Sequence, residues 1–201
     1  MRYSFKAWFY GHFFHSLCRP HYKSARDALS VVKEHKAITL RARDMNDEKL
    51  LSSYIMGIYF IAMNRCDGLS PEENYEILEK SLKASSMFRK GLGTAEDYLE
   101  ESRMPGRLKW AEESKNRRNE NNWVLDVLPK CEEYDLGYNY YECGICKLCK
   151  DEGCPELARY LCKLDYMMAD LMNAKLIRTK TLAEGGDMCD FRYSLKRYDP
   201  A

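Results

Sequence analysis

The chain has 201 residues, enough for one domain with a substantial core, and we expect a single domain over residues 1–201. Its 32 basic and 31 acidic residues leave a formal charge of +1, so no overall field attracts it to nucleic acid or to an anionic membrane. We therefore expect neither of these partners and favour a small-molecule substrate.

The N-terminal residues and the cysteine content indicate a cytoplasmic location. Residues 1–21 are rich in aromatic side chains and show neither an apolar signal region nor a small-residue cleavage site. The longest apolar run, from Leu50 to Met63, is shorter than the about 20 residues that a bilayer-spanning helix needs. Nine cysteines without an export signal favour reduced thiols, metal ligation or catalysis over disulfide bonds.

Apolar spacing predicts helices through residues 1–102, which we call the helical half. After Pro20, apolar residues recur every three to four positions and indicate a helix. Asn46 or Asp47 can cap the next helix, which is apolar and ends near Cys66. That apolar helix is typical of a buried element.

The best-marked helix start follows. Ser70, Pro71 and Glu73 supply the N-cap, the first-turn proline and the reciprocal partner of a capping box, and Gly91 is expected to end this helix. A short helix over about residues 95–102 closes the helical half.

The next segment, residues 103–122, is polar and charged and shows no periodicity, so we expect it to be a connecting segment. From Trp123 the period changes to two. This predicts strands over residues 123–128 and 138–143.

The last part of the chain predicts a helix and a hairpin. Pro155 opens a helix with an apolar stripe, and the hairpin over residues 174–195 turns at Gly185 and Gly186. The expected fold class is therefore α+β, in which the helical half precedes a β-β-α-β-β antiparallel sheet unit over residues 123–201.

A cysteine cluster lies between the second strand and this helix. It consists of four thiols within twelve residues, Cys143, Cys146, Cys149 and Cys154. The order Cys-x2-Cys-x2-Cys-x4-Cys-Pro is close to a ferredoxin signature, but its last spacing is one residue longer and no second motif is present. We favour the interpretation that Cys146, Cys149 and Cys154 are inert, partly buried residues of a strand-to-helix connection.

Zinc is the other metal to consider. A zinc ion needs four ligands, and two cysteines of the cluster together with two later ones can supply them: Cys143, Cys146, Cys162 and Cys189. We expect no cofactor, and this zinc site stays open as an alternative.

A carboxylate lies on the same helix face as one of the later thiols. Asp165 follows Cys162 by three residues, at the edge of the apolar stripe. A buried carboxylate needs a cation such as Arg178 or has a raised pKa suited to proton transfer. Cys143 and Cys189 are expected in the same sheet. Two interpretations remain, a site where thiols and a carboxylate converge, or a core aspartate paired with arginine beside inert cysteines.

Three stretches, "YNYYECGICKL", "CPELARYLCKLDYMMADLM" and "LIRTKTLAEGGDMCDFRY", occur in this order. They resemble the L-2-amino-thiazoline-4-carboxylic acid hydrolase family, in which a Tyr-x-x-Cys strand end, a Cys-x-x-Asp helix and an Arg-Thr-x-Thr hairpin recur. The resemblance covers about residues 110–193.

This resemblance implies hydrolysis of a cyclic amidine-like C=N substrate, of the type that opens 2-amino-thiazoline-4-carboxylate to N-carbamoyl-cysteine. The matching positions are Cys143, Cys162, Asp165, Arg178, Thr179, Thr181 and Cys189. The catalytic candidates are Asp165 and the three cysteines Cys143, Cys162 and Cys189. Asp165 is the expected general base, and Cys189 or Cys162 is the expected nucleophile or metal ligand. Arg178, with Thr179 and Thr181, is the candidate for binding the substrate carboxylate.

Two other functions remain. The first is a non-enzymatic ligand-binding module similar to vinyl-4-reductase domains, with the aromatic first helix lining an apolar cavity. The second is a metal or redox protein that uses the cysteine cluster. The same aromatic residues can also form core or a homodimer surface. His12, His15 and His21 can contribute to a site, although ordinary packing is favoured for the first two.

Overall fold

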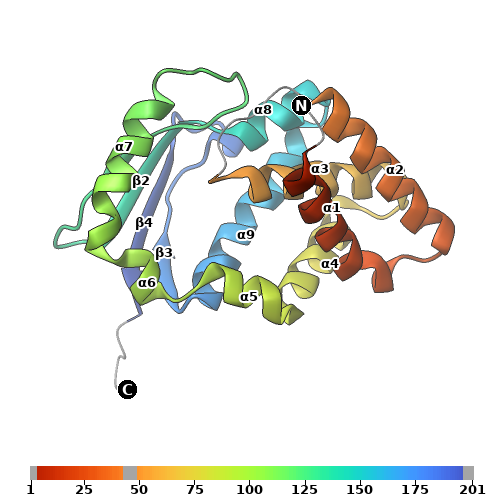
Figure 1. Cartoon of the computed structure of the whole chain (residues 1–201), viewed down its shortest axis with the longest axis horizontal. Helices are drawn as coiled ribbons and strands as arrows, with labels where there is room; N and C mark the ends of the chain where they lie inside the picture. Colours follow the sequence, from red (N-terminus) through yellow and green to blue (C-terminus); the bar gives the residue numbers. More distant parts are fainter. Residues whose placement is uncertain (1–3, 43–48, 197–201) are drawn as a thin grey trace.

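A computed structural model describes residues 4–42 and 49–196, and it confirms the α+β class. Most of the helices gather on one side of the molecule, and the four-stranded antiparallel sheet lies on the other side together with the two helices between Ala95 and Ser114 (Figure 1). The helices are α1 (Phe5–Cys18), α2 (Ala25–Arg41), α3 (Leu51–Cys66), α4 (Pro71–Ala84), α5 (Ser86–Leu92), α6 (Ala95–Leu99), α7 (Met104–Ser114), α8 (Gly144–Asp151) and α9 (Ala158–Leu171). Short 3₁₀ segments lie at Arg19–His21, Glu101–Arg103, Pro155–Leu157 and Leu182–Glu184.

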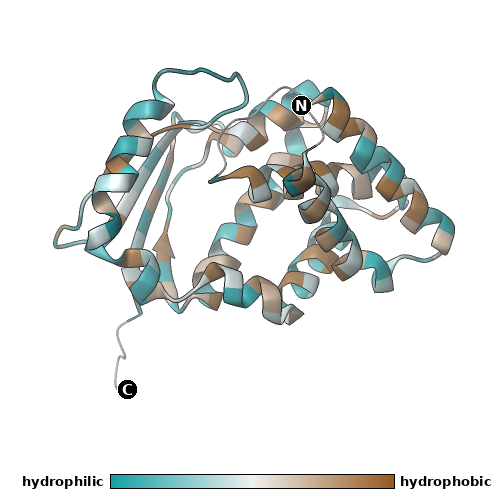
Figure 2. Cartoon of the chain, viewed as in Figure 1, coloured by the Kyte–Doolittle hydropathy of each residue, from teal (hydrophilic) through white to brown (hydrophobic). Residues whose placement is uncertain are grey.

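The apolar helix α3 is the centre of the helical half. Its residues from Tyr54 to Met63 are all buried, as expected of a helix that is apolar on every side. Helices α1, α2 and α4 pack against it, and each contributes hydrophobic residues to the core (Figure 2). The expected caps of α3, Asn46 and Asp47, lie outside the described residues.

The capping box at the start of α4 is confirmed. The Ser70 hydroxyl accepts from the Glu73 backbone N–H, and the Glu73 carboxylate accepts from the Ser70 N–H. The helix does not continue to Gly91, however. It ends at Ala84, because Ser85 is extended (ψ 112°) and uses its hydroxyl to cap α5.

The segment expected to be a connection, residues 103–122, contains helix α7. Sequence periodicity missed it because two of the three buried residues on its inner face, Arg107 and Ser114, are polar. Arg107 donates to the carbonyl of Glu100, and Ser114 accepts from the Leu125 N–H. Hydrogen bonds to the backbone thus replace the apolar stripe that a hydropathy pattern detects.

The sheet consists of β1 (Val124–Leu128), β2 (Leu136–Glu142), β3 (Ala174–Ile177) and β4 (Cys189–Leu195), in the order β1-β2-β4-β3. Tyr138 lies opposite Phe191, and Tyr140 lies opposite Cys189. Their side chains alternate along the strands, so these four residues share one face of the sheet. Figure 1 shows α9 between the sheet and the helical half.

Two helices, not one, connect β2 to β3. The expected β-β-α-β-β unit is therefore β-β-α-α-β-β. The extra helix α8 contains Cys146 and Cys149, for which the sequence predicts a strand-to-helix connection. It forms because Ile145, Leu148 and Cys149 occur at helical spacing and are buried against the rest of the core.

Across residues 4–42 and 49–196, no helix combines the length and the apolar character needed to cross a bilayer.

Candidate active site

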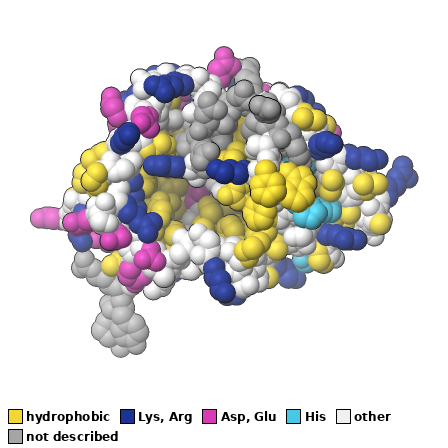
Figure 3. All heavy atoms as spheres, in the orientation of Figure 1, with side chains coloured by type: hydrophobic (Ala, Val, Ile, Leu, Met, Phe, Trp, Pro, Cys, Tyr) yellow, Lys and Arg dark blue, Asp and Glu magenta, His cyan; other side chains and the backbone are white. Residues whose placement is uncertain are grey.

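A cavity of about 340 Å³ lies between α3, α9 and the inner face of the sheet. Figure 3 shows this hollow, with hydrophobic side chains over most of its wall. The lining includes four of the candidate residues, Cys143, Cys162, Asp165 and Cys189, and also Arg178. Segments far apart in the sequence therefore bring these groups together.

Cys143 lies where strand β2 passes into helix α8. It is the N-cap residue of α8 and has an extended backbone (φ −121°, ψ 121°). The neighbouring Cys146 thiol lowers the pKa of Cys143, and the backbone N–H groups of Ile145 and Cys146 act in the same direction, although burial and the charge of Asp165 oppose this. The pKa of Cys146 is raised, because its thiol donates to Cys143 and is buried.

The position of Cys143 depends on the residue that follows. A Cβ atom on Gly144 would lie 2.4 Å from the carbonyl oxygen of Asn121 and 2.7 Å from the Trp123 ring. Only glycine permits this close approach of the helix start to the segment before β1. Gly144 therefore helps to determine the position of the Cys143 thiol in the cavity wall.

Asp165 has the cationic partner that the sequence analysis named. Arg178 Nη1 donates to Asp165 Oδ2 at 2.6 Å, and the side chains are 4% and 25% exposed, respectively. Burial raises the pKa of Asp165 to about 6, while the Arg178 charge and hydrogen bond act in the opposite direction. Its carboxyl group therefore changes protonation near neutral pH, as an acid-base group requires.

Arg178 is held on several sides. Its Nη2 donates to the Cys162 carbonyl at 2.9 Å. The guanidinium carbon lies 4.9 Å from the centre of the Tyr166 ring and 4.8 Å from that of Phe191. These contacts direct Arg178 toward Asp165, at the wall of the cavity.

The two other thiols of the cavity have raised pKa values. Burial raises the pKa of Cys162 strongly, and the Asp165 charge adds to this effect. Burial also raises the pKa of Cys189 to about 11, although the Leu182 N–H donates to its sulfur at 3.2 Å. Of the three cavity cysteines, Cys143 is the one whose surroundings favour the thiolate.

Thr179 and Thr181 lie outside the lining of this cavity. Thr179 donates to the Asp190 carboxylate at 2.5 Å, and Thr181 donates to Glu184 at 2.9 Å. Both therefore organise the turn between β3 and β4. The thiols of Cys149 and Cys154 are also neighbours, and their interaction raises the pKa of Cys149 and lowers that of Cys154.

All nine cysteines are free thiols. No group of three or more His, Cys, Asp or Glu within residues 4–42 and 49–196 is arranged to hold a metal ion.

Sequence reasoning missed several residues of the wall. Lys49 precedes α3 and brings a cation to the cavity, with its Nζ 5.0 Å from the centre of the Trp110 ring and 3.4 Å from the Gly106 oxygen. Tyr98 of α6 and Tyr140 of β2 add aromatic surface. Lys49 belongs to no sequence motif. Its place in the cavity wall is visible only in the folded structure.

The histidines of the N-terminal region lie elsewhere. His12 and His15 line a separate cavity between α1, α2 and α3, and His21 lies beside a surface hollow near Glu73. None of the three lines the cavity that contains Cys143 and Asp165.

The fold and cavity define an α+β protein in which thiols and a paired carboxylate from the C-terminal half face an open, mainly apolar cavity. The family model described as L-2-amino-thiazoline-4-carboxylic acid hydrolase matches residues 48–193, more than half of the 201 residues. The chain belongs to this family, which confirms the resemblance. No match was found among curated proteins or among solved structures.

Proposed function

We propose that this chain is a hydrolase that opens a small cyclic amidine-like substrate, of the 2-amino-thiazoline-4-carboxylate type, to an N-carbamoyl product. The observation that carries the proposal is the shared cavity of Cys143, whose pKa is lowered, and Asp165, whose pKa is raised to about 6. The two groups titrate in the directions that a nucleophile and an acid-base catalyst need. Membership of the hydrolase family supports the same reaction class.

The first step uses both groups. Asp165 takes the proton of the Cys143 thiol as the sulfur adds to the substrate carbon that bears two nitrogens and the ring sulfur. The bond from that carbon to the ring sulfur breaks, and Asp165 gives its proton to the departing sulfur. The opened substrate is then joined to Cys143 as an S-linked isothiourea.

The second step releases the product. Asp165 takes a proton from water as the oxygen adds to the same carbon, and the other water proton ends on the substrate nitrogen. The carbon–sulfur bond to Cys143 breaks, which leaves a carbamoyl group on the product. The proton on Asp165 returns to Cys143, so the site regains its first state.

The remaining charged groups have separate roles. We assign Arg178 to positioning, because it holds Asp165 and the Cys162 carbonyl. Lys49 is the cation that we assign to the substrate carboxylate, since it lines the cavity on the side of α3 and α7. The reaction needs Cys143 reduced, which a cytoplasmic location would favour.

A ligand-binding module is the second candidate function. It is favoured by the mainly hydrophobic wall of the cavity and by the pairing of its carboxylate with Arg178. In that case, the cavity would bind a small molecule without turnover.

One experiment separates the two functions. The purified chain is incubated with 2-amino-thiazoline-4-carboxylate, and N-carbamoyl-cysteine is measured by liquid chromatography and mass spectrometry, beside calorimetric binding of the same compound. We expect product from the wild-type chain and none from C143A, with C131S as the matched control because Cys131 is exposed and outside the cavity. Binding without product in the wild-type chain would favour the binding module and contradict the hydrolase.

A further inference from the structure

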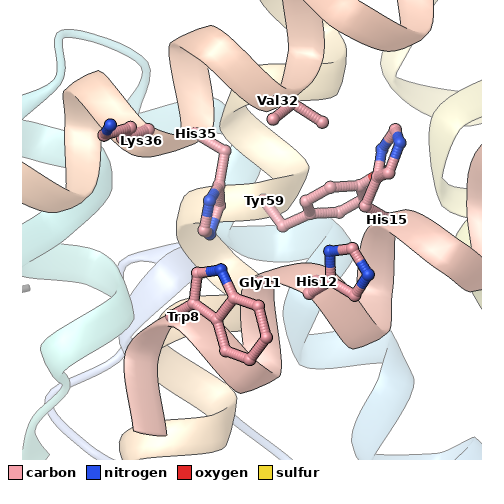
Figure 4. A pocket seen from close by; sticks show the side chains of 8 residues that line it. All are labelled: Trp8, Gly11, His12, His15, Val32, His35, Lys36 and Tyr59. Carbon is pink, nitrogen blue, oxygen red and sulfur yellow. The ribbon is translucent and has the colours of Figure 1, made fainter. Parts of the chain in front are cut away.

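A second cavity, of about 220 Å³, lies between α1, α2 and α3, away from the cavity of Cys143. Figure 4 shows its lining. His35 and Tyr59 form the inner end, and Trp8, His12 and Lys36 lie around them. His35 is 4% exposed, whereas Trp8 is 45% exposed. The cavity thus leads from an aromatic rim to a buried imidazole.

The fold makes room for this imidazole in an unusual way. A Cβ atom on Gly11 would lie 2.3 Å from His35 Cε1, so the absence of a side chain on α1 lets the ring of His35 enter. His35 Nε2 has no hydrogen-bond partner among the described residues, although it is buried. A buried polar atom without a protein partner normally meets a ligand or an ordered water.

The other polar groups of the cavity are mostly donors. Lys36 has an ammonium group, Trp8 an indole N–H, and Tyr59 a hydroxyl that pairs with Tyr22 and lies 3.5 Å from His15 Nδ1. No acidic side chain is among the described residues that line the cavity. Such a set of groups suits a ligand that accepts hydrogen bonds and has a negative charge.

The rings around the opening suit a flat molecule. Trp8 and His12 lie nearly parallel, at 12° with their centres 5.5 Å apart, and the Tyr59 ring is 5.7 Å from that of His35. The volume of about 220 Å³ is several times the about 30 Å³ that one water occupies in the liquid.

We propose that this cavity is a second binding site, which takes a small aromatic carboxylate with its charged end toward His35 and Lys36. The site is separate from the proposed reaction, because none of its lining residues faces Cys143 or Asp165.

Binding should depend on pH. Burial and the nearby His15 lower the pKa of His35 to about 4, so its ring is neutral at pH 7 when the cavity holds no anion. The other titratable groups in the lining that face His35 are His12 and Lys36. The charge of Asp67 acts on the Tyr59 hydroxyl, whose pKa it raises. A carboxylate beside these imidazoles favours their protonated forms, so affinity rises as pH falls.

The probes are benzoate and benzamide, which have the same shape but differ in charge. Each is titrated into the full chain by calorimetry at pH 6 and pH 8. We expect benzoate to bind at least about tenfold more tightly than benzamide, and more tightly at pH 6 than at pH 8. Equal binding of the two probes, or no binding of either to folded protein, would overturn the proposal.

Surface variants locate the site without disturbing the core. K36M should weaken benzoate binding several-fold, whereas K33M, on the same helix and also exposed, should not change it. K49M reports on the other cavity. Benzoate binding that is lost in K49M and kept in K36M would place the probe beside Cys143 and contradict the second site.

A spectroscopic measurement completes the test. In a chain with ¹⁵N-labelled histidine, benzoate should shift the His35 ring nitrogens, and H35F should remove the binding if it folds. An unchanged His35 signal at saturating benzoate would also overturn the proposal.

Discussion

Arg178 Nη1 lies 2.6 Å from Asp165 Oδ2, so the only acidic side chain among the described residues of the main cavity is held by a cation that follows strand β3. Asp165 lies on α9, and the intervening residues belong to the end of that helix and to β3. The ion pair therefore fixes the last helix of the sheet unit against the strand that follows it. The protonation of Asp165 depends on this contact.

The rate of the proposed reaction should decrease at low pH. Asp165 acts first as a base, so it must be ionised, and its raised pKa of about 6 sets the range in which this changes. We expect kcat/KM to be highest above pH 6 and to fall about tenfold for each pH unit well below it. A pH–rate profile between pH 4.5 and 9 checks this, and a rate that is constant or rises below pH 6 would exclude Asp165 as the base.

Replacing Arg178 by lysine should move that profile. The Arg178 charge and hydrogen bond lower the pKa of Asp165, and an ammonium group cannot bond the carboxylate and the Cys162 carbonyl in the same fixed geometry. We expect R178K to shift the acidic limb to higher pH, with a larger effect on kcat than on KM. R159K is the control, because Arg159 is exposed and lies on α9, the helix that contains Asp165. An unshifted profile in R178K would assign Arg178 a structural role only.

Cys143 should be the cavity thiol that reacts fastest with alkylating agents. The Cys146 thiol and the backbone N–H groups at the start of α8 lower the pKa of Cys143, whereas the pKa values of Cys162 and Cys189 are raised. We expect limiting iodoacetamide at pH 7.5 to modify Cys143 first among these three, as measured by peptide mass spectrometry in a C131S background. Faster modification of Cys162 would transfer the nucleophile role to that residue.

Two glycine substitutions should have opposite effects on stability. In G144A the new Cβ atom meets the Asn121 oxygen at 2.4 Å, so we expect the unfolding free energy to fall by about 1–3 kcal/mol and activity to fall with it. G106A, in the first turn of α7, meets no atom within 4 Å and should raise stability by about 0.5–1 kcal/mol. Denaturant unfolding of both variants measures the difference, and a neutral G144A would show that the start of α8 adapts.

Much of the fold can be predicted from local chemistry. The capping box at Ser70 and Glu73 consists of residues three apart, and the apolar stripe of α9 places Asp165 at its edge, so both are visible in the sequence. Helix α7 is not visible, because Arg107 and Ser114 satisfy backbone groups that come from other segments. A pattern of hydropathy cannot report such contacts.

The same limit applies to the two cavities. Cys143 and Asp165 belong to motifs, so the sequence indicates them. Lys49 and His35 belong to none, and their surroundings are made by other elements of the chain. The pocket at His35 depends on a glycine of another helix, Gly11, which no single-segment pattern connects to it.

The wall of the main cavity has two origins. The thiols and the carboxylate come from residues 143–189, whereas Ser53 and Met56 of α3 and Leu92 of α5 shape the opposite side. Substitutions in α3 or α5 can therefore change which molecules fit, while the reacting groups keep their positions. Reactivity and selectivity are inherited on different stretches of chain, so related proteins can diverge in one while the other stays the same.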